Sequence, residues 1–149
     1  MKDVLVIMGS ASDEPVLEGC IKYLEKFGLS FDKMIASAHR NPAKVAEIAG
    51  SAAKNYKVII AAAGKAAHLP GVIAGHTILP VIGIPIKTSD LGGIDSLYSI
   101  VQMPKGVPVA TVAINGAENA AILAAQILSL KDEKLKKKLI KFKKELQAG

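Results

Sequence analysis

Short apolar runs alternate along the chain with longer segments in which apolar residues recur every three or four positions. The short runs predict buried strands, and the longer segments predict amphipathic helices. The predicted strands span residues 4–8, 31–37, 57–63, 80–86 and 107–113. The predicted helices span residues 15–27, 42–55, 69–76, 96–101 and 117–130, and a basic helix closes the chain.

The repeated order of strand and helix predicts a parallel sheet with helices on both faces. We therefore expect an α/β fold, namely a three-layer, doubly wound sandwich with a central parallel five-stranded sheet of the flavodoxin-like or Rossmann-like kind. Residues 1–130 form the predicted α/β domain, and residues 131–149 form a C-terminal helix that docks on the same or a neighbouring subunit. Such folds bind ligands beyond the carboxyl ends of their strands, so we expect function in the loops that follow the strands.

The composition fits a single domain with an aliphatic core. Of the 149 residues 50% are hydrophobic but only 4% are aromatic, so Ala, Val, Ile and Leu must supply the core. The one cysteine, Cys20, excludes a disulfide within the chain and favours a reducing compartment, and its apolar helical setting predicts a buried structural thiol. Neither a signal peptide nor a membrane-spanning apolar run is apparent, which predicts a cytoplasmic protein without membrane contact.

The net charge of +6 is concentrated at the C-terminal end of the chain. Residues 131–149 contain eight lysines and three acidic residues, a net charge of +5, which leaves +1 for the rest. The apolar stripe of this basic helix consists of Leu135, Leu139, Phe142 and Leu146. The stripe favours a docked helix with solvated lysines over membrane or nucleic-acid binding. A nucleic-acid binder, which would show a steep salt dependence, is the alternative.

The loop after the first predicted strand has the residues of a phosphate and ribose site. Gly9 lets a ligand approach the backbone, and Ser10 and Ser12 offer hydroxyl donors beside a helix start, where unpaired N–H groups favour anions. Asp13 does not suit a phosphate but can accept hydrogen bonds from ribose hydroxyls. For this loop alone, an ordinary turn with a Ser or Asp N-cap is the alternative.

The next two loops add a cation and two histidines. Ser37, His39 and Arg40 follow the second predicted strand, where an arginine can clamp phosphate and a histidine can give and take protons near neutral pH. His68 follows the third predicted strand, where a purely structural hydrogen bond is the alternative. The histidines and Cys20 lack metal-ligand spacing. These residues therefore predict acid–base chemistry beside a phosphate site, without a metal or nucleotide cofactor.

The chain resembles the N5-carboxyaminoimidazole ribonucleotide mutases of purine biosynthesis, the class I catalytic subunit type, in the segments "MGSASD", "SAHRNP", "AGKAAHLPG" and "DSLYSIVQMPKGVPVATVAI". The resemblance covers nearly the whole chain in order. It implies that a carboxylate moves from the exocyclic nitrogen of aminoimidazole ribonucleotide to the neighbouring ring carbon through carbon dioxide, with a histidine that shuttles the proton. It also implies the absence of ATP, metal and other cofactors, a homo-octamer with sites at subunit contacts, and functional coupling to the ATP-dependent synthetase that forms the carbamate.

The same resemblance implies roles for the loop residues. His39 is implied as the general acid–base and His68 as a second catalytic residue. The substrate's phosphate and ribose are implied to contact Ser10, Ser12, Asp13, Ser37 and Arg40. The wall of the carboxylate and carbon dioxide pocket is implied to consist of Ala63, Gly64, Ala67, His68 and Leu69. Gln102 and Met103 are implied to be buried in a loop near the site or an interface.

Two other functions are alternatives to the mutase. The first is direct carboxylation of aminoimidazole ribonucleotide by carbon dioxide, as in class II relatives. These typically show "SAHK" and a "GRSN"-like pocket, so Arg40 and "AAHLPG" favour the mutase. The second is a non-enzymatic nucleotide- or phosphate-sensing module on the same fold, which would not need His39 and an aliphatic pocket together.

Lys65 is the sharpest departure from the class I motif, which has a glycine at this position, as in "AGGAAHLPG". A positive φ would strain a lysine here by about 1 kcal/mol. We therefore expect an ordinary backbone and a side chain that points to solvent or to a neighbouring subunit. The alternative is that the ammonium reaches the substrate's phosphate or carboxylate and strengthens binding.

Overall fold

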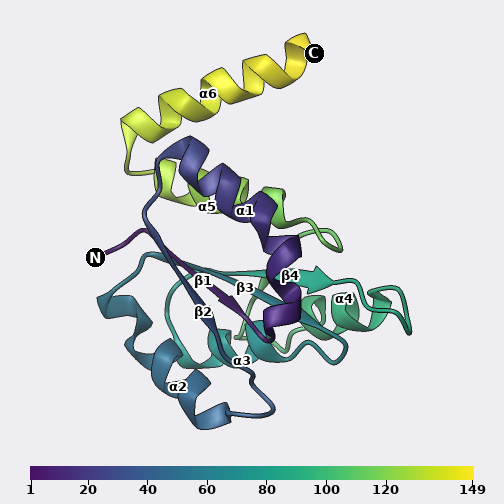
Figure 1. The fold of residues 1–149 in the computed structure, drawn as a ribbon. Helices are drawn as coiled ribbons and strands as arrows, with labels where there is room; N and C mark the ends of the chain where they lie inside the picture. The colour runs from purple at the N-terminus through teal and green to yellow at the C-terminus, as the bar shows by residue number, and fades with distance from the viewer.

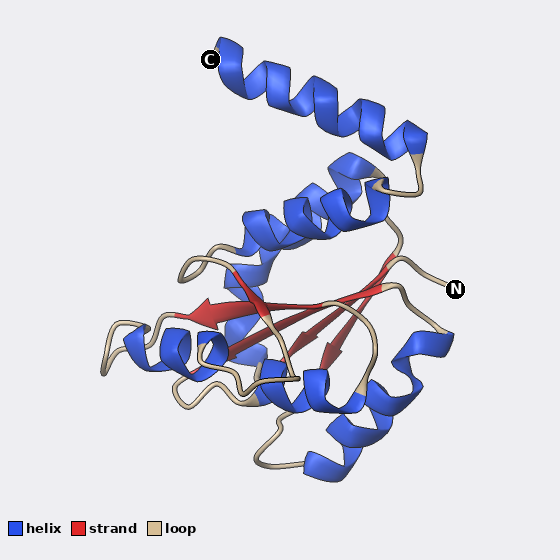
Figure 2. Cartoon of the chain, turned by 180° about the vertical axis from the view of Figure 1, so that it is seen from behind, coloured by secondary structure: helices blue, strands red, loops and turns tan.

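Five parallel strands form one sheet, in the order β2-β1-β3-β4-β5, in the computed structural model, which describes all 149 residues (Figures 1 and 2). The strands are β1 (Val4–Met8), β2 (Phe31–Ile35), β3 (Val58–Gly64), β4 (Val81–Ile86) and β5 (Ala110–Thr111). This sheet confirms the predicted fold class, and its order is that of flavodoxin-like folds. The chain reverses direction across the sheet beside β1, so a ligand is expected where the carboxyl ends of β1 and β3 meet.

Helices cover both faces of the sheet, as Figure 2 shows. One face carries α1 (Glu14–Phe27), α5 (Ala117–Ser129) and α6 (Glu133–Ala148). The other face carries α2 (Pro42–Ser51), α3 (Leu69–His76) and α4 (Ile94–Val101). Two short 3-10 helices, Ala11–Asp13 and Ala52–Lys54, lie immediately before α1 and after α2.

The two faces of the sheet have separate cores because successive strand residues point to opposite sides. In β1, Val4 and Val6 pack into the core beneath α1 and α5, whereas Leu5 and Ile7 pack into the core beneath α2 and α3. Cys20 of α1 is buried in the first core, where burial and the charge of Glu118 raise the pKa of its thiol to about 12. The thiol is therefore buried, as predicted.

Several predicted boundaries differ from the structure. The strand predicted at 107–113 is reduced to Ala110–Thr111, because β5 lies at the sheet edge and Pro108 has no N–H for a ladder. The strand predicted at 31–37 ends at Ile35, and the helix predicted at 42–55 changes to a 3-10 turn after Ser51. The helix predicted at 96–101 begins two residues earlier, at Ile94, which follows a glycine in the left-handed region.

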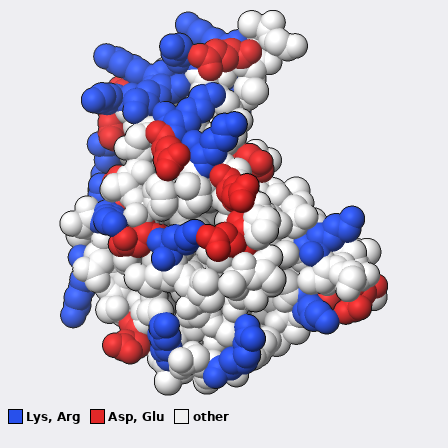
Figure 3. Space-filling model, in the orientation of Figure 1, with Lys and Arg blue, Asp and Glu red and all other residues white.

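The basic C-terminal helix α6 packs on its own chain. Leu135, Leu139 and Phe142 are buried, and the Phe142 ring meets the Phe27 ring edge-on at 5.6 Å. The fourth residue of the stripe, Leu146, is 57% exposed. Figure 3 shows that the lysines of this region gather over the outer side of α6. None of the helices is both long and apolar enough to cross a membrane.

The carboxylate of Asp3 links the segments that immediately precede β1, β2 and β3. Asp3 accepts hydrogen bonds from the backbone N–H and the hydroxyl of Ser30, at 2.9 and 2.8 Å, and from the ammonium of Lys57 at 2.8 Å. Burial alone would raise the pKa of Asp3, but the hydrogen bonds from Lys57 and Ser30 outweigh burial, so the pKa lies below its ordinary value of 3.8.

We expect Asp3→Asn to lower the free energy of unfolding by about 1 kcal/mol at neutral pH, because an ionised and partly solvated acceptor is lost. Since the pKa is depressed in the folded state, this contribution is fully present above the ordinary value of 3.8 and is lost as the pH falls through the folded-state pKa. Urea unfolding of both proteins from neutral to strongly acidic pH measures the difference. A difference that does not shrink on acidification would contradict this interpretation.

Candidate active site

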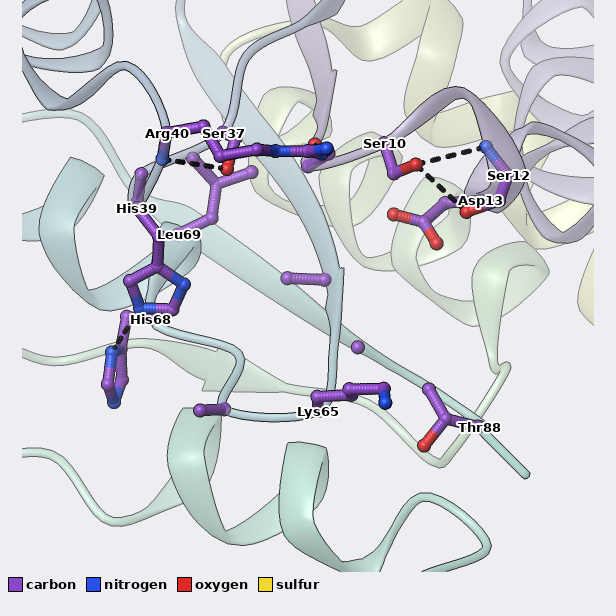
Figure 4. Close-up of a pocket in the computed structure, with 15 residues that line it drawn as sticks. Ser10, Ser12, Asp13, Ser37, His39, Arg40, Lys65, His68, Leu69 and Thr88 are labelled. Carbon is purple, nitrogen blue, oxygen red and sulfur yellow. Dashed lines mark hydrogen bonds between the residues drawn. The ribbon is translucent and has the colours of Figure 1, made fainter. Parts of the chain in front are cut away.

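A pocket of about 520 Å³ lies at the carboxyl ends of the strands, where the loops after β1, β2, β3 and β4 converge (Figure 4). This is the edge of the sheet at which the alternation of elements predicted a site. Its 15 lining residues are Gly9, Ser10, Ser12, Asp13, Ser37, Ala38, His39, Arg40, Ala63, Gly64, Lys65, Ala66, His68, Leu69 and Thr88. Ten of the eleven predicted site residues are among them, and Ala67 is the exception.

The loop after β1 forms the first wall of the pocket. Ser10 has an extended backbone and caps the 3-10 helix, since its hydroxyl accepts from the backbone N–H of Ser12 at 3.3 Å. The Ser12 hydroxyl donates to the Ser10 hydroxyl at 2.9 Å, so the two lie side by side. The N-cap alternative is therefore correct for Ser10, and it is compatible with a ligand because both hydroxyls still line the pocket.

Asp13 is the only acidic residue that lines the pocket, and it is just 8% exposed. Burial raises the pKa of its carboxyl, and a backbone hydrogen bond with Ser10 opposes that shift only in part. The side chain makes no capping hydrogen bond at the start of α1. A buried carboxylate that does not cap its helix is suited to accept hydrogen bonds from the hydroxyls of a ligand.

The loop after β2 forms the second wall and is joined to the first. Arg40 donates from Nη2 to the backbone carbonyl of Gly9 at 3.2 Å, and its own backbone N–H donates to the Ser37 hydroxyl at 3.2 Å. The two loops are neighbours because β1 and β2 pair along their whole length. The remaining guanidinium donors have no protein partner, so an anion at this wall can use them.

Two histidines from different loops meet at the third wall. Nε2 of His39 and Nδ1 of His68 are 2.7 Å apart, and the two rings are nearly perpendicular. One ring donates an N–H and the other accepts, so the contact orients both. In Figure 4 the His68 ring lies beyond the His39 ring, and the second nitrogen of His39 faces the middle of the pocket. The sequence predicted both histidines at the site but did not indicate that their rings are in contact.

Small residues after β3 form the remaining wall. Ala63, Gly64 and Leu69 line the pocket, whereas Ala67 is 1% exposed and belongs to the core beneath α2 and α3. A methyl group on Gly64 would lie 2.9 Å from the side chain of Thr88, so the close approach of the loop after β4 requires glycine there.

Thr88 was missed by the sequence analysis, although it follows the fourth predicted strand and so met the same rule as the other loops. It lines the pocket, and its hydroxyl oxygen is buried without a hydrogen-bond partner. Ala38 and Ala66 are further lining residues without a distinctive sequence signal. Conversely, Gln102 is exposed and Met103 is half-buried against α3, and neither lines the pocket of the single chain.

Lys65 has a left-handed backbone, with φ +53°, so the expectation of an ordinary backbone was wrong. This conformation costs a non-glycine residue about 1–2 kcal/mol. The side chain lines the pocket, and its ammonium lies 2.9 Å from the carboxylate of Asp90, in the loop after β4. The hydrogen bond between them raises the pKa of Lys65 and lowers the pKa of Asp90.

Known sequences match this chain along nearly its whole length and indicate one family. A family model described as AIR carboxylase matches residues 3–149. The N5-carboxyaminoimidazole ribonucleotide mutase of Thermotoga maritima is 53% identical over 148 residues, which are 99% of this chain and 86% of that protein. The protein of the same name from Haemophilus influenzae is 52% identical and covers 94% of this chain. The phosphoribosylaminoimidazole carboxylase of Saccharomyces cerevisiae is 54% identical, but this chain matches only 24% of its length.

Comparison with solved structures agrees with the sequence matches. The crystal structure of Treponema denticola PurE superposes with a TM-score of 0.89, at 28% identity. The superposition covers 97% of this chain and 91% of that chain. The fold is therefore shared along almost the entire length of the chain.

Proposed function

The chain belongs to the AIR carboxylase family, and we propose that it is the isomerase of purine biosynthesis that converts N5-carboxyaminoimidazole ribonucleotide to 4-carboxy-5-aminoimidazole ribonucleotide. The observation that carries this conclusion is the match to proteins named as the mutase, at about half identity and nearly full length. The direct carboxylase is not favoured, because the yeast carboxylase that matches is about four times longer and resembles this chain over only 24% of its length. The presence of Arg40 in "SAHR" also favours the mutase.

The proposed substrate fits the distribution of donors and acceptors in the pocket. We assign the phosphate to Arg40 and the hydroxyls of Ser10 and Ser12, because these are the donors gathered at the walls after β1 and β2. Asp13, which lies between this cluster and the middle of the pocket, accepts from the ribose hydroxyls. Ser37 holds the Arg40 backbone and thereby positions the guanidinium.

His39 is assigned as the group that moves the proton. The carbamate N–C bond breaks, its electron pair stays on nitrogen, and protonated His39 gives that nitrogen a proton as carbon dioxide leaves. The neighbouring ring carbon then attacks the carbon dioxide, and His39 removes the proton from that carbon, which restores the aromatic ring. The sum is an isomerisation with no net proton. His68 is assigned as a positioning residue, since its 2.7 Å contact with Nε2 leaves the other nitrogen of His39 toward the pocket.

The wall of small residues is assigned to carbon dioxide. Ala63, Gly64 and Leu69 have no polar side-chain atoms and leave room for a small uncharged intermediate. The main requirement is that carbon dioxide stays close to one carbon and away from water, so that it is recaptured instead of lost.

The proposal is tested by incubating the purified protein with the carbamate substrate at low bicarbonate, and separately with aminoimidazole ribonucleotide and bicarbonate, while product absorbance is followed. We expect efficient conversion of the carbamate and slow use of the second mixture. The opposite preference supports the direct carboxylase. Binding of the nucleotides without any conversion supports the sensing module.

We further propose a homo-octamer that works in the cytoplasm and receives its labile carbamate from the ATP-dependent synthetase. A stripe of large apolar side chains on and just before α4 supports assembly, since Leu91, Ile94, Tyr98 and Val101 are each 46–63% exposed in the single chain. Light scattering on the purified protein measures the mass. A monomer that is fully active would contradict the assembly.

Asp13 is expected to lower the stability of the fold at neutral pH and to strengthen substrate binding. Because burial raises the pKa of Asp13 in the folded state, the charged form is disfavoured there. The contribution of this carboxyl to the free energy of unfolding is therefore lost as the pH rises from the unfolded-state pKa through the folded-state pKa. We expect Asp13→Asn to be at least as stable as the wild type at neutral pH, yet to raise KM by about 10-fold through loss of a charged acceptor. Thermal unfolding and steady-state kinetics measure the two effects. A less stable variant with normal KM would contradict the ribose assignment.

A further inference from the structure

Two cationic side chains lie on opposite sides of the pocket. Arg40 is close to Ser10 on one side, and Lys65 is close to Thr88 on the other (Figure 4). Asp13 is the only acidic lining residue, so the pocket as a whole favours an anionic ligand. This arrangement matches a ligand with one anionic group at each end.

The strained backbone of Lys65 indicates that the position of its side chain at the pocket has a function. Its left-handed φ of +53° would be strain-free for glycine, and residues in such conformations concentrate at ligand sites. In Figure 4 the side chain runs along the wall toward Thr88 instead of away from the pocket. A strained lysine whose ammonium stays at the rim is consistent with a role in binding.

The present partner of Lys65 can be exchanged. Its ammonium donates to Asp90 at 2.9 Å, but the Lys65 and Asp90 side chains are 69% and 64% exposed, so water and salt screen the pair. Asp90 does not line the pocket. A carboxylate enclosed in the pocket, away from water, interacts more strongly with the same ammonium. The unpaired hydroxyl of Thr88 lies on this side too, where an acceptor oxygen of a ligand would give it a partner.

We propose that Lys65 binds the carboxylate of the carboxylated nucleotide in exchange for Asp90, while Arg40 binds the phosphate. This inference rests on the proposed function, because the carboxylated ribonucleotide has its phosphate and its carboxylate at opposite ends. The cation stabilises the carboxylated nucleotides but not neutral carbon dioxide. Lys65 therefore contributes to affinity and to selection of the carboxylated nucleotides, and it does not accelerate the chemical step.

The test is calorimetric titration of the stable product, 4-carboxy-5-aminoimidazole ribonucleotide, and of aminoimidazole ribonucleotide, which lacks the carboxylate. We expect Lys65→Gln to weaken binding of the product by about 10-fold and to change binding of aminoimidazole ribonucleotide by less than about 2-fold. Lys65→Gly should show the same selective loss although it removes the backbone strain. Equal losses for both nucleotides, or no loss, overturn the proposal.

Asp90→Asn is expected to change the affinity for the product in the opposite direction. If Asp90 competes with the ligand, its neutralisation should tighten product binding by about 2-fold, and this gain should vanish in the Lys65→Gln background. Weaker binding in Asp90→Asn would show that Asp90 supports the site, and it would overturn the exchange. The two proposals fail separately: a wild-type protein that binds neither nucleotide contradicts the proposed function, whereas tight product binding that Lys65→Gln leaves intact contradicts only the role of Lys65.

Discussion

Replacing His39 by asparagine is expected to lower kcat by about 10²–10⁴-fold, the range for loss of a positioned general acid–base. Binding of the product should stay within about 2-fold of the wild type, because the phosphate is assigned to Arg40 and the serines and not to the histidine. Asparagine is polar and smaller than histidine, so the pocket should keep its shape. Kinetics with the carbamate and titration with the product measure the two quantities.

The matched control for this variant is His76→Asn. His76 is an exposed histidine at the end of α3 and does not line the pocket. We expect its activity to equal that of the wild type. Near-normal kcat in His39→Asn would exclude His39 as the acid–base, and a comparable loss in His76→Asn would show that the effect is not specific to the site.

Replacing Arg40 by methionine is expected to raise KM by about 10–100-fold, because a charge-assisted hydrogen bond to the phosphate is lost. The change also removes the link to the carbonyl of Gly9, which joins the loops after β1 and β2. Arg40→Lys should fall between the wild type and the methionine variant, since it keeps the charge but not the planar fork of donors.

The control for Arg40 is Lys44→Met, which removes an exposed cation in the first turn of α2, just after the loop that contains Arg40. If the phosphate contacts Arg40 directly, KM in Lys44→Met should be unchanged. A similar rise in both methionine variants would mean that general electrostatic attraction, and not a specific contact, determines KM.

The sequence was sufficient to predict the sheet because the apolar runs at β1, β3 and β4 are buried on both faces and are therefore continuous. It also placed the candidate site. Parallel strands bring their carboxyl ends to one edge, so Ser10, His39 and His68 had to lie near one another once the fold was known. The short strand β5 was overestimated because its apolar residues pack in an extended segment without forming a full ladder.

Features that depend on how the loops lie relative to one another could not be predicted from the sequence. The 2.7 Å contact of the histidines depends on how α3 begins, and the pairing of Lys65 with Asp90 joins residues 25 positions apart. The left-handed backbone of Lys65 runs against the preference of lysine, and the signal that pointed to it was the glycine that the class I motif has at this position. Ala67 was misplaced because a run of small residues does not reveal which side chains face the core and which face the pocket.

The central claim is that the carboxylate moves within one nucleotide instead of coming from solution. The most direct measurement is conversion of the carbamate substrate, labelled with carbon-13 in its carboxylate, in the presence of excess unlabelled bicarbonate. Mass spectrometry of the product then reports the origin of the carboxylate. We predict that the product keeps the label, because the wall of small residues holds the carbon dioxide until the ring carbon recaptures it. A product whose carboxylate carries the isotope composition of the bicarbonate would contradict this account.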